Sequence, residues 1–120
     1  MRLQMLLSAE KIYLSPSIYV DCDRQDLVKD KLRLSLSRVQ YRLLYRLLVE
    51  LGHPVPNKVL INFVWGEELC SLNGLYICVH RIRKMIEADV RHPKHLIPVK
   101  GLGYMLCSTY PGRSFSSASG

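Results

Sequence analysis

Apolar residues in the first third of the chain come in short runs separated by polar segments. Residues 18–20 are Ile-Tyr-Val, and from residue 32 to 36 every second residue is leucine. A two-residue period is typical of strands that bury one face. The polar segments 22–26 and 29–31 predict turns between such strands. We therefore predict a small antiparallel meander of short strands over residues 11–36.

The period of the apolar residues changes to that of a helix at Ser37. Ser37 and Gln40 have the spacing of a capping box, in which each side chain accepts from the other residue's backbone N–H. Leucines then recur at helical spacing as far as Leu51, and Gly52 stands where a left-handed cap is expected. This pattern predicts a first helix, whose solvated face carries Arg38, Arg42 and Arg46.

Two further helices are predicted, with a short loop between them. The second covers Lys58–Trp65, with Asn57 as its cap, Gly66 at its end and Trp65 in the core. The third runs from Leu72 to about Asp89. Six residues fall on one side of this third helix and predict its buried stripe: Leu75, Cys78, Val79, Ile82, Met85 and Ile86.

A β-hairpin is predicted after the third helix, from strands over Leu96–Val99 and Tyr104–Cys107 and a glycine-rich turn at residues 100–103. A helix-turn-helix followed directly by a hairpin is the order of a winged helix. The predicted fold is therefore α+β: a winged helix-turn-helix with an N-terminal antiparallel sheet, three helices and a C-terminal hairpin wing. It would occupy residues 1–107, followed by a flexible Ser/Gly-rich tail over residues 108–120.

The composition fits one domain with an acidic partner. The 120 residues are 48% hydrophobic, which is enough for a core, and the formal net charge is +7. The basic excess is concentrated after residue 80, where seven Lys and Arg face two acidic residues. We therefore expect a polyanion to bind the C-terminal third of the chain.

Enzymatic, metal-binding and membrane functions find no support in the sequence. The cysteines at 22, 70, 78 and 107 lack metal-ligand spacing, so we predict reduced thiols, partly buried, and no metal. There is no phosphate-binding loop, nucleophile triad or apolar carboxylate pair, so we expect no enzyme, no catalytic residue and no cofactor. His92 and His95 are predicted to be exposed loop residues. No apolar run reaches ~18 residues, so we expect a cytoplasmic protein that does not bind membranes.

The outer face of the third helix has side chains suited to DNA, and no acidic residue precedes Glu87 on this helix. A solvated or protein-binding face would fit this composition equally well. The DNA-binding candidates are Asn73 and His80 for base edges, Tyr76 for a base or a phosphate, Ile77 for a thymine methyl, and Arg81 and Lys84 for phosphates. Arg83 either contacts a phosphate or pairs with Glu87. In the hairpin, we add Lys100, Gly101 and Gly103.

Four segments match the motifs of one known family in order and spacing. Residues 36–44 resemble its L-T-x-x-E-x-x-L-L opening, and residues 55–67 its V-S-R-x-x-L…V-W-G segment. Residues 79–86 resemble its I-S-R-L-R-K-K-L helix end, and residues 99–104 its wing. This is the OmpR/PhoB-type DNA-binding (effector) domain of response regulators, and the resemblance covers about residues 18–106.

The resemblance implies a four-stranded N-terminal sheet and a transcription regulator whose partner is double-stranded DNA. The third helix would enter the major groove and the wing the neighbouring minor groove. The loop over residues 66–72 would contact RNA polymerase, and two copies would bind direct repeats head to tail. Response regulators also carry a phosphorylated receiver domain, for which 120 residues leave no room. We expect either an excised effector domain or a stand-alone regulator.

Departures from the family's motifs leave a second function open. Asn73-Gly74 replaces an Arg-Thr pair at the start of the third helix, and Pro98 and Lys100 replace the Thr and Arg of the wing. The alternative is a winged-helix protein-interaction module, an adaptor or antagonist of a related regulator or of RNA polymerase.

Overall fold

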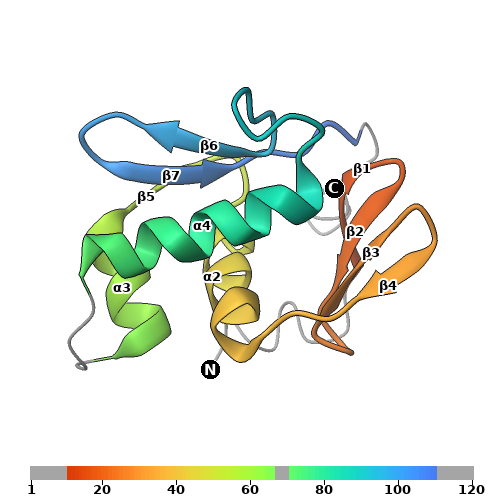
Figure 1. The fold of residues 1–120 in the computed structure, drawn as a ribbon, viewed down its shortest axis with the longest axis horizontal. Helices are drawn as coiled ribbons and strands as arrows, with labels where there is room; N and C mark the ends of the chain where they lie inside the picture. Colours follow the sequence, from red (N-terminus) through yellow and green to blue (C-terminus); the bar gives the residue numbers. More distant parts are fainter. Residues whose placement is uncertain (1–10, 67–70, 111–120) are drawn as a thin grey trace, which may run out of the picture. The chain divides into compact units, whose positions relative to one another are not determined.

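The computed structural model describes residues 11–66 and 71–110, and the chain forms two compact units (Figure 1). The first unit comprises the described residues up to Leu36 together with those from Ser108 onward. The second comprises the described residues of Ser37–Cys107. Each unit is considered by itself below.

The first unit contains a four-stranded antiparallel sheet, which confirms the predicted meander. The strands follow the chain in the order β1-β2-β3-β4. On one face, Ile12, Val20 and Leu27 stand opposite one another across three strands and are fully buried. The bounds of the strands are β1 Lys11–Ser15, β2 Ile18–Asp21, β3 Asp26–Lys29 and β4 Leu32–Leu34.

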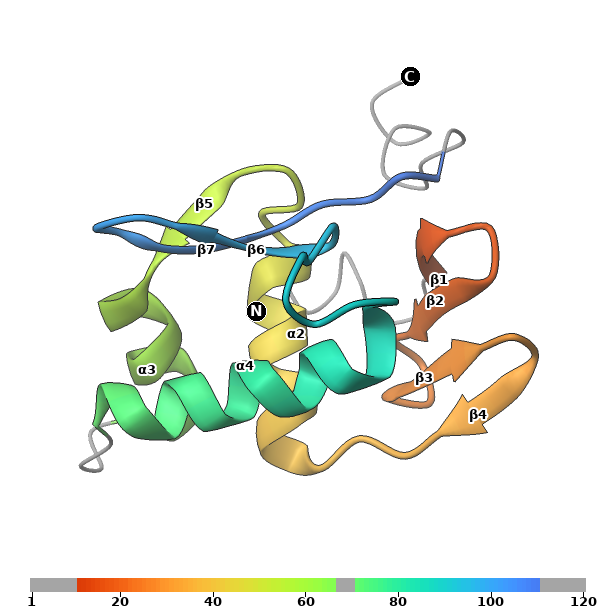
Figure 2. The ribbon, with the colours of Figure 1, turned by 45° about the horizontal axis from the view of Figure 1, so that its top comes forward.

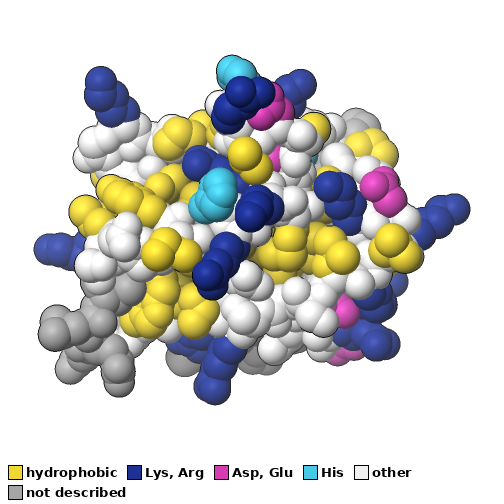
Figure 3. Space-filling model, viewed as in Figure 1, with side chains coloured by type: hydrophobic (Ala, Val, Ile, Leu, Met, Phe, Trp, Pro, Cys, Tyr) yellow, Lys and Arg dark blue, Asp and Glu magenta, His cyan; other side chains and the backbone are white. Residues whose placement is uncertain are grey.

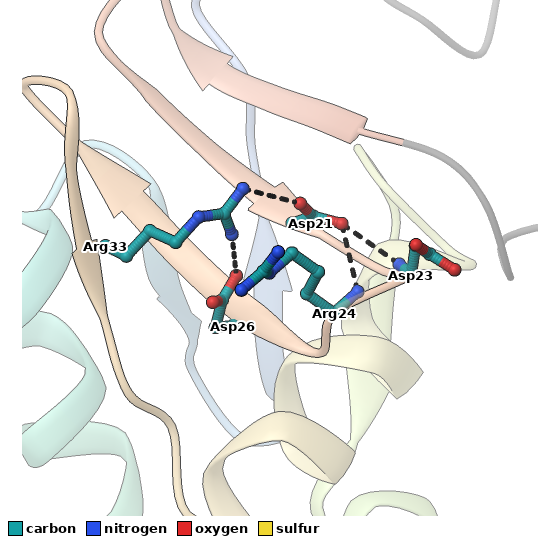
Figure 4. A network of polar contacts seen from close by, with 5 residues as sticks. All are labelled: Asp21, Asp23, Arg24, Asp26 and Arg33. Carbon is teal, nitrogen blue, oxygen red and sulfur yellow. Dashed lines mark hydrogen bonds and ion pairs between the residues drawn. The ribbon is translucent and has the colours of Figure 1, made fainter.

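Both predicted turns of this sheet are present. At Asp30 and Lys31 the backbone has φ values of 52° and 71°, as a two-residue hairpin turn of the right twist requires. In the turn between β2 and β3, the buried carboxylate of Asp21 accepts from the backbone N–H of Asp23 and of Arg24, at 3.1 Å each. The side chain of Asp21 therefore holds this turn in place (Figure 4).

Arg33 connects β4 to β2 and β3 through two ion pairs (Figure 4). Its Nη1 lies 2.7 Å from Asp26 Oδ1, and its Nη2 lies 3.2 Å from Asp21 Oδ2. Burial alone would raise the pKa of the Asp21 carboxyl, but the hydrogen bonds from Arg24 and Arg33 outweigh it and the pKa is lowered. Asp21 is therefore a carboxylate that the folded sheet keeps charged.

The predicted flexible tail begins with three residues that are bound to the sheet. Ser108 Oγ donates to the carbonyl of Tyr13 at 2.7 Å, and Thr109 N donates to that of Leu14 at 2.8 Å. The ring of Tyr110 stacks on that of Tyr13, with centroids 4.6 Å apart. Ser108–Tyr110 thus cover the edge strand β1, and the remainder of the predicted tail, residues 111–120, lies outside the described residues.

The second unit contains three helices and a three-stranded sheet in the order β5-β7-β6, whose strands lie side by side in both ribbon views (Figures 1 and 2). The predicted winged helix is confirmed. The helices are α2 Arg38–Leu48, α3 Asn57–Trp65 and α4 Leu72–Ile86. The strands are β5 Pro54–Pro56, β6 Leu96–Val99 and β7 Gly103–Leu106.

The start of α2 is as predicted, and its end is not. Ser37 and Gln40 form the capping box, with distances of 3.0 and 2.9 Å. The helix ends at Leu48, three residues before the predicted Leu51, and the backbone continues in a turn. Gly52 has the predicted positive φ, 86°, and its N–H donates to the carbonyl of Leu106 in β7 at 2.8 Å. Gly52 therefore joins the chain after α2 to the sheet.

Arg42 is not merely solvated. Its Nη2 donates to the carbonyl of Phe63 at 2.6 Å, and its guanidinium lies 5.0 Å from the centroid of the Phe63 ring. Phe63 is in the last turn of α3, where carbonyls lack partners within the helix and no basic residue of α3 is present. Arg42 supplies the missing donor from α2, and so fastens the two helices together.

The predicted cap of α3 is wrong, and its predicted core anchor is only half-buried. Pro56, and not Asn57, is the N-cap, and the N–H of Asn57 donates to the carbonyl of Leu102 at 2.9 Å. The buried residues of α3 are Leu60 and Val64, whereas Trp65 is half-buried. The prediction that Gly66 ends the helix is confirmed, with a φ of 70°.

Strand β5 is not predicted by the sequence pattern, because two of its three residues are prolines. Proline lacks the N–H that a central strand needs, but it is tolerated at a sheet edge. Here β5 is an edge strand that pairs with β7 through Pro54 opposite Met105, Val55 opposite Tyr104 and Pro56 opposite Gly103.

Candidate nucleic-acid interface

Helix α4 presents two faces that the sequence separates correctly. Leu75, Cys78, Val79, Ile82 and Ile86 are buried, as the predicted stripe requires, whereas Met85 is half-buried. The opposite face is exposed at each of the remaining candidates: Asn73, Tyr76, Ile77, His80, Arg81 and Lys84. In the space-filling view, Lys, Arg and His side chains gather with apolar ones over this helix (Figure 3).

The exposed face of α4 has positive charge and no negative charge within the helix. Its sequence, LNGLYICVHRIRKMI, contains no Asp or Glu. The helix also begins with a residue that the sequence analysis did not identify, Ser71, whose hydroxyl lies 3.4 Å from the N–H of Gly74 as an N-cap. This bond is long, and the N–H of Gly74 also donates to the backbone carbonyl of Ser71, at 3.0 Å.

Arg83 does not lie on the exposed face, and it does not pair with Glu87. Its Nε and Nη2 donate to the carbonyl of Leu96 in β6, at 3.1 and 2.9 Å. Its guanidinium also lies 5.6 Å from the centroid of the Tyr104 ring in β7. Burial raises the pKa of the Tyr104 hydroxyl. Arg83 thus fixes the hairpin against α4 through contacts within the protein.

Glu87 is a structural residue that sequence reasoning missed. It caps the C-terminal end of α4 and is buried. Its carboxylate accepts from three consecutive backbone N–H groups: Lys94 at 2.7 Å, His95 at 3.0 and 3.2 Å, and Leu96 at 2.7 Å. The end of α4 is thereby tied to the start of β6. No side-chain pattern reports this contact, because all three donors belong to the backbone.

The two histidines of the loop between α4 and β6 differ. His92 is exposed, as predicted, and its Nδ1 lies 3.1 Å from Asp89 Oδ2. His95, predicted to be exposed, is buried, and its Nδ1 lies 3.0 Å from the carbonyl of Cys107. Arg91 is an exposed cation of the same loop, with its Nε 3.4 Å from Asp89 Oδ1.

The tip of the hairpin is shorter than the glycine-rich segment suggests. Lys100, Gly101 and Leu102 are exposed, and Gly101 has a φ of 77°, which favours glycine. Gly103, predicted to lie at the tip, is buried in β7 between β5 and β6. A Cβ at this position would collide with the carbonyl of Val55. Gly103 therefore permits close packing of the backbone of two strands.

The predicted polymerase-binding loop is described only at its two ends. Gly66, Ser71 and Leu72 are described, and residues 67–70, including Cys70, lie outside the described residues. Gly66 and Leu72 line a hollow together with residues of α3: Asn57, Lys58, Ile61 and Asn62.

The cysteines at 22, 78 and 107 are at least partly buried. Cys22 and Cys78 are buried, as predicted, and burial raises the pKa of the Cys107 thiol, which opposes thiolate formation. Within residues 11–66 and 71–110, no three His, Cys, Asp or Glu residues are grouped so that they could hold a metal ion. In the same part of the chain, no helix has the length and apolar character needed to cross a membrane.

Comparisons with known proteins identify relatives among signalling regulators. The chain is 32% identical over 93 residues to the sensory transduction protein RegX3 of Mycobacterium leprae, which covers 77% of this chain and 47% of that protein. The chain thus spans about half the length of this relative. It also resembles the response regulator DrrB of Thermotoga maritima, an OmpR/PhoB homologue, with a TM-score of 0.76 and 22% identity, over 89% of this chain and 49% of the other.

A second solved structure matches an isolated domain. The DNA-binding domain of Klebsiella pneumoniae RstA, in complex with the RstA box, has a TM-score of 0.70 and 17% identity, over 82% of this chain and 97% of the other. Likenesses at this identity show the winged-helix fold. The sequence model of the family described as "Transcriptional regulatory protein, C terminal" matches residues 31–106, which include the three helices and the wing. The chain therefore belongs to the family of C-terminal domains of transcriptional regulatory proteins.

Proposed function

We propose that the chain binds double-stranded DNA in a sequence-specific manner and regulates transcription, as a binding protein and not an enzyme. Helix α4 enters the major groove, and the hairpin of β6 and β7 reaches the adjacent minor groove. The observation that carries this proposal is the exposed, acid-free face of α4 next to a wing that Arg83 and Glu87 hold in a fixed position. Because its target is DNA, we place the protein in the cytoplasm.

The proposed interface has base-reading and phosphate-binding parts. Asn73 and His80 have the hydrogen-bonding groups that distinguish base edges, and both are exposed on α4. Arg81, Lys84 and the tip residue Lys100 carry exposed positive charges suited to phosphates. Tyr76, Ile77 and Gly101 complete the proposed interface. Arg83 and Gly103 are left out of it, because their contacts are within the protein.

Assembly on DNA follows from the family and is part of the proposal. Two copies bind direct repeats head to tail, and the loop over residues 66–72 contacts RNA polymerase. Input through a phosphorelay belongs to a longer protein or to a separate partner. Family membership and relatives such as the sensory transduction protein RegX3 support a regulatory role, and the head-to-tail pairing and the polymerase contact are what the family resemblance implies.

The test is selection of bound sequences from a random duplex pool at near-physiological salt. We expect a short motif, repeated directly about one helical turn apart. Replacing Asn73 or His80 by alanine should cost ~1–3 kcal/mol at one base position and relax the choice of base there.

A matched pair of variants separates phosphate contacts from net charge. Lys84→Ala should reduce the slope of log K against log salt by ~0.9, because one fewer counterion is released. Arg24→Ala removes the same charge from an exposed turn of the N-terminal sheet and should leave the slope unchanged. If no motif is enriched, and the protein instead forms a stable complex with a related regulator or with RNA polymerase, the chain is the protein-interaction module and DNA reading is refuted.

A further inference from the structure

The N-terminal sheet has a second face, opposite the one that buries Leu27, and this face is not mainly polar. One row of directly opposed residues crosses it: Tyr13, Tyr19, Val28 and Arg33. Antiparallel sheets that bury one face ordinarily present polar side chains on the other. The two rings and the buried valine of this row therefore require a reason.

A hollow lies beside this row, at the end of the sheet where two turns meet. Pro16 and Ser17 from the turn between β1 and β2, and Asp30 and Lys31 from the turn between β3 and β4, complete its lining. The N–H of Asp30 donates to the carbonyl of Ser17 at 2.9 Å, so the two turns are held together. The volume of the hollow is about 660 Å³, within the ~300–1,000 Å³ of small-molecule sites.

The stability of the sheet explains only part of this surface. The rings of Tyr13 and Tyr19 are 4.9 Å apart, and cross-strand aromatic pairs stabilise a sheet. No such contact explains Lys31, whose backbone has a φ of 71°. Glycine adopts this conformation without strain, whereas lysine does not. Lysine thus stands where the backbone favours glycine, which indicates a use for its side chain.

The hollow has one available cation and one available anion. Lys31 and Asp30 are exposed, and neither side chain has a hydrogen-bond or ion-pair partner within the described part of the chain. Arg33 is instead engaged by two carboxylates, those of Asp21 and Asp26 (Figure 4). A ligand with a single charge would meet one unlike and one like charge at the hollow. A zwitterion would meet an unlike charge at both of its groups.

We propose that the hollow is a binding site for a zwitterionic aromatic molecule, of the class of the aromatic α-amino acids. The ring packs on the apolar lining around Tyr19 and Val28, the carboxylate pairs with Lys31, and the ammonium pairs with Asp30. All of these residues belong to the first unit, whereas α4 and the wing belong to the second. The inference therefore does not depend on the proposed binding of DNA.

Titration with three small molecules tests the required charge pattern. L-Phenylalanine carries both charges, phenethylamine only the ammonium, and hydrocinnamate only the carboxylate. Amide NMR spectra of the full 120-residue chain follow each titration, since molecules of this size should have dissociation constants on the order of 1 mM. L-Phenylalanine should bind up to ~five-fold more tightly than either of the others, and the shifts should concentrate at Ser17, Tyr19 and Asp30.

Two variants should change the preference among the three molecules. In Asp30→Asn, which suits the φ of 52°, L-phenylalanine and hydrocinnamate should bind equally, because the partner of the ammonium is lost. In Lys31→Gly, L-phenylalanine and phenethylamine should bind equally, and the transition in urea should stay where it is or move to higher concentration. Arg24→Ala removes a cation from the turn between β2 and β3, at the other end of the sheet, and should leave all three affinities unchanged.

The outcomes that would overturn the inference concern the first unit alone. Equal affinities of the parent chain for the three molecules would refute the recognition of a zwitterion. Shifts spread over both units, or no shifts up to the solubility limit of L-phenylalanine, would refute the site. A preference for L-phenylalanine that survives in both variants would refute the roles of Asp30 and Lys31. None of these results would alter the proposed DNA interface, which lies in the second unit.

Discussion

Replacing Glu87 by glutamine tests the contact that joins the end of α4 to the wing. The carboxylate of Glu87 is buried and accepts from the backbone N–H groups of Lys94, His95 and Leu96. Glutamine has nearly the same shape, but one of its two terminal atoms is an NH2 donor. Whichever way the amide turns, it faces the N–H of Lys94 or of Leu96 with a donor, and that N–H loses its acceptor.

The magnitude follows from the number and type of hydrogen bonds. A hydrogen bond to a charged group contributes ~1.5–3 kcal/mol, and an unsatisfied buried donor costs ~1–3 kcal/mol. Because Glu87→Gln loses one acceptor and weakens the other, we expect the free energy of unfolding to fall by about 2–3 kcal/mol. For a domain whose whole stability is ~5–15 kcal/mol, this is a large fraction.

Urea unfolding measures the difference. The transition midpoint should fall while the slope with denaturant stays constant, because the surface exposed on unfolding is unchanged. The matched control is Asp89→Asn, two residues further along the chain, where the carboxylate is 45% exposed. Its contacts with Arg91 and His92 are at the surface, so the expected change is within about 0.5 kcal/mol. A Glu87→Gln variant as stable as the Asp89→Asn variant would refute the assignment of Glu87 as the buried acceptor.

Three further predictions concern backbone packing, the wing and pH. Gly103→Ala should destabilise the domain by ~1–3 kcal/mol, because the added Cβ collides with β5. Gly101→Ala should cost less, about 1 kcal/mol, because nothing lies within 4 Å of its Cβ and only the positive φ is strained. Thermal unfolding ranks the two variants, and the reverse order would contradict the close packing at Gly103. Arg83→Ala should lower stability without changing the salt slope of DNA binding, unlike Lys84→Ala, and a reduced slope would make Arg83 a phosphate contact after all. The folded sheet lowers the pKa of Asp21, so its charge stabilises the fold above the unfolded pKa of 3.8, and this stability is lost as the pH falls through the folded pKa. The difference in unfolding free energy between the parent and Asp21→Asn should therefore be constant at neutral pH and vanish in acid. A difference that does not depend on pH would contradict the lowered pKa.

Elements that depend on neighbours in the sequence are the ones that the sequence predicts well. The capping box of Ser37 and Gln40 and the buried stripe of α4 are set by spacings of three and four residues, and both are present. The strands of the first sheet and the hairpin follow from alternation and from turn residues such as Gly101. These features predict the winged helix without knowledge of any distant contact.

The sequence does not predict features that depend on backbone groups distant in the chain. The sequence leaves Arg83 between a phosphate contact and a pair with Glu87, because the partner that it has in the structure, the carbonyl of Leu96, has no side-chain signature. His95 was expected to be exposed because the Cys107 carbonyl that it faces is 12 residues away. Gly103 is predicted at the tip because a glycine that a turn requires and a glycine that packs closely against a neighbouring strand look the same in a sequence. In each case the sequence singles out the residue, but the reason for its type is a tertiary contact with a residue distant in the chain.

The segment Ser108–Tyr110 bears on where the domain can be shortened. The family match ends at residue 106, and a chain cut there would lack the hydrogen bonds to the carbonyls of Tyr13 and Leu14. Strand β1 would then present unpaired carbonyl groups and the uncovered ring of Tyr13 along the outer edge of its sheet. An open edge is a template for pairing with the same strand of another molecule. A minimal DNA-binding fragment should therefore extend to Tyr110, and the shorter one should self-associate as its concentration is raised.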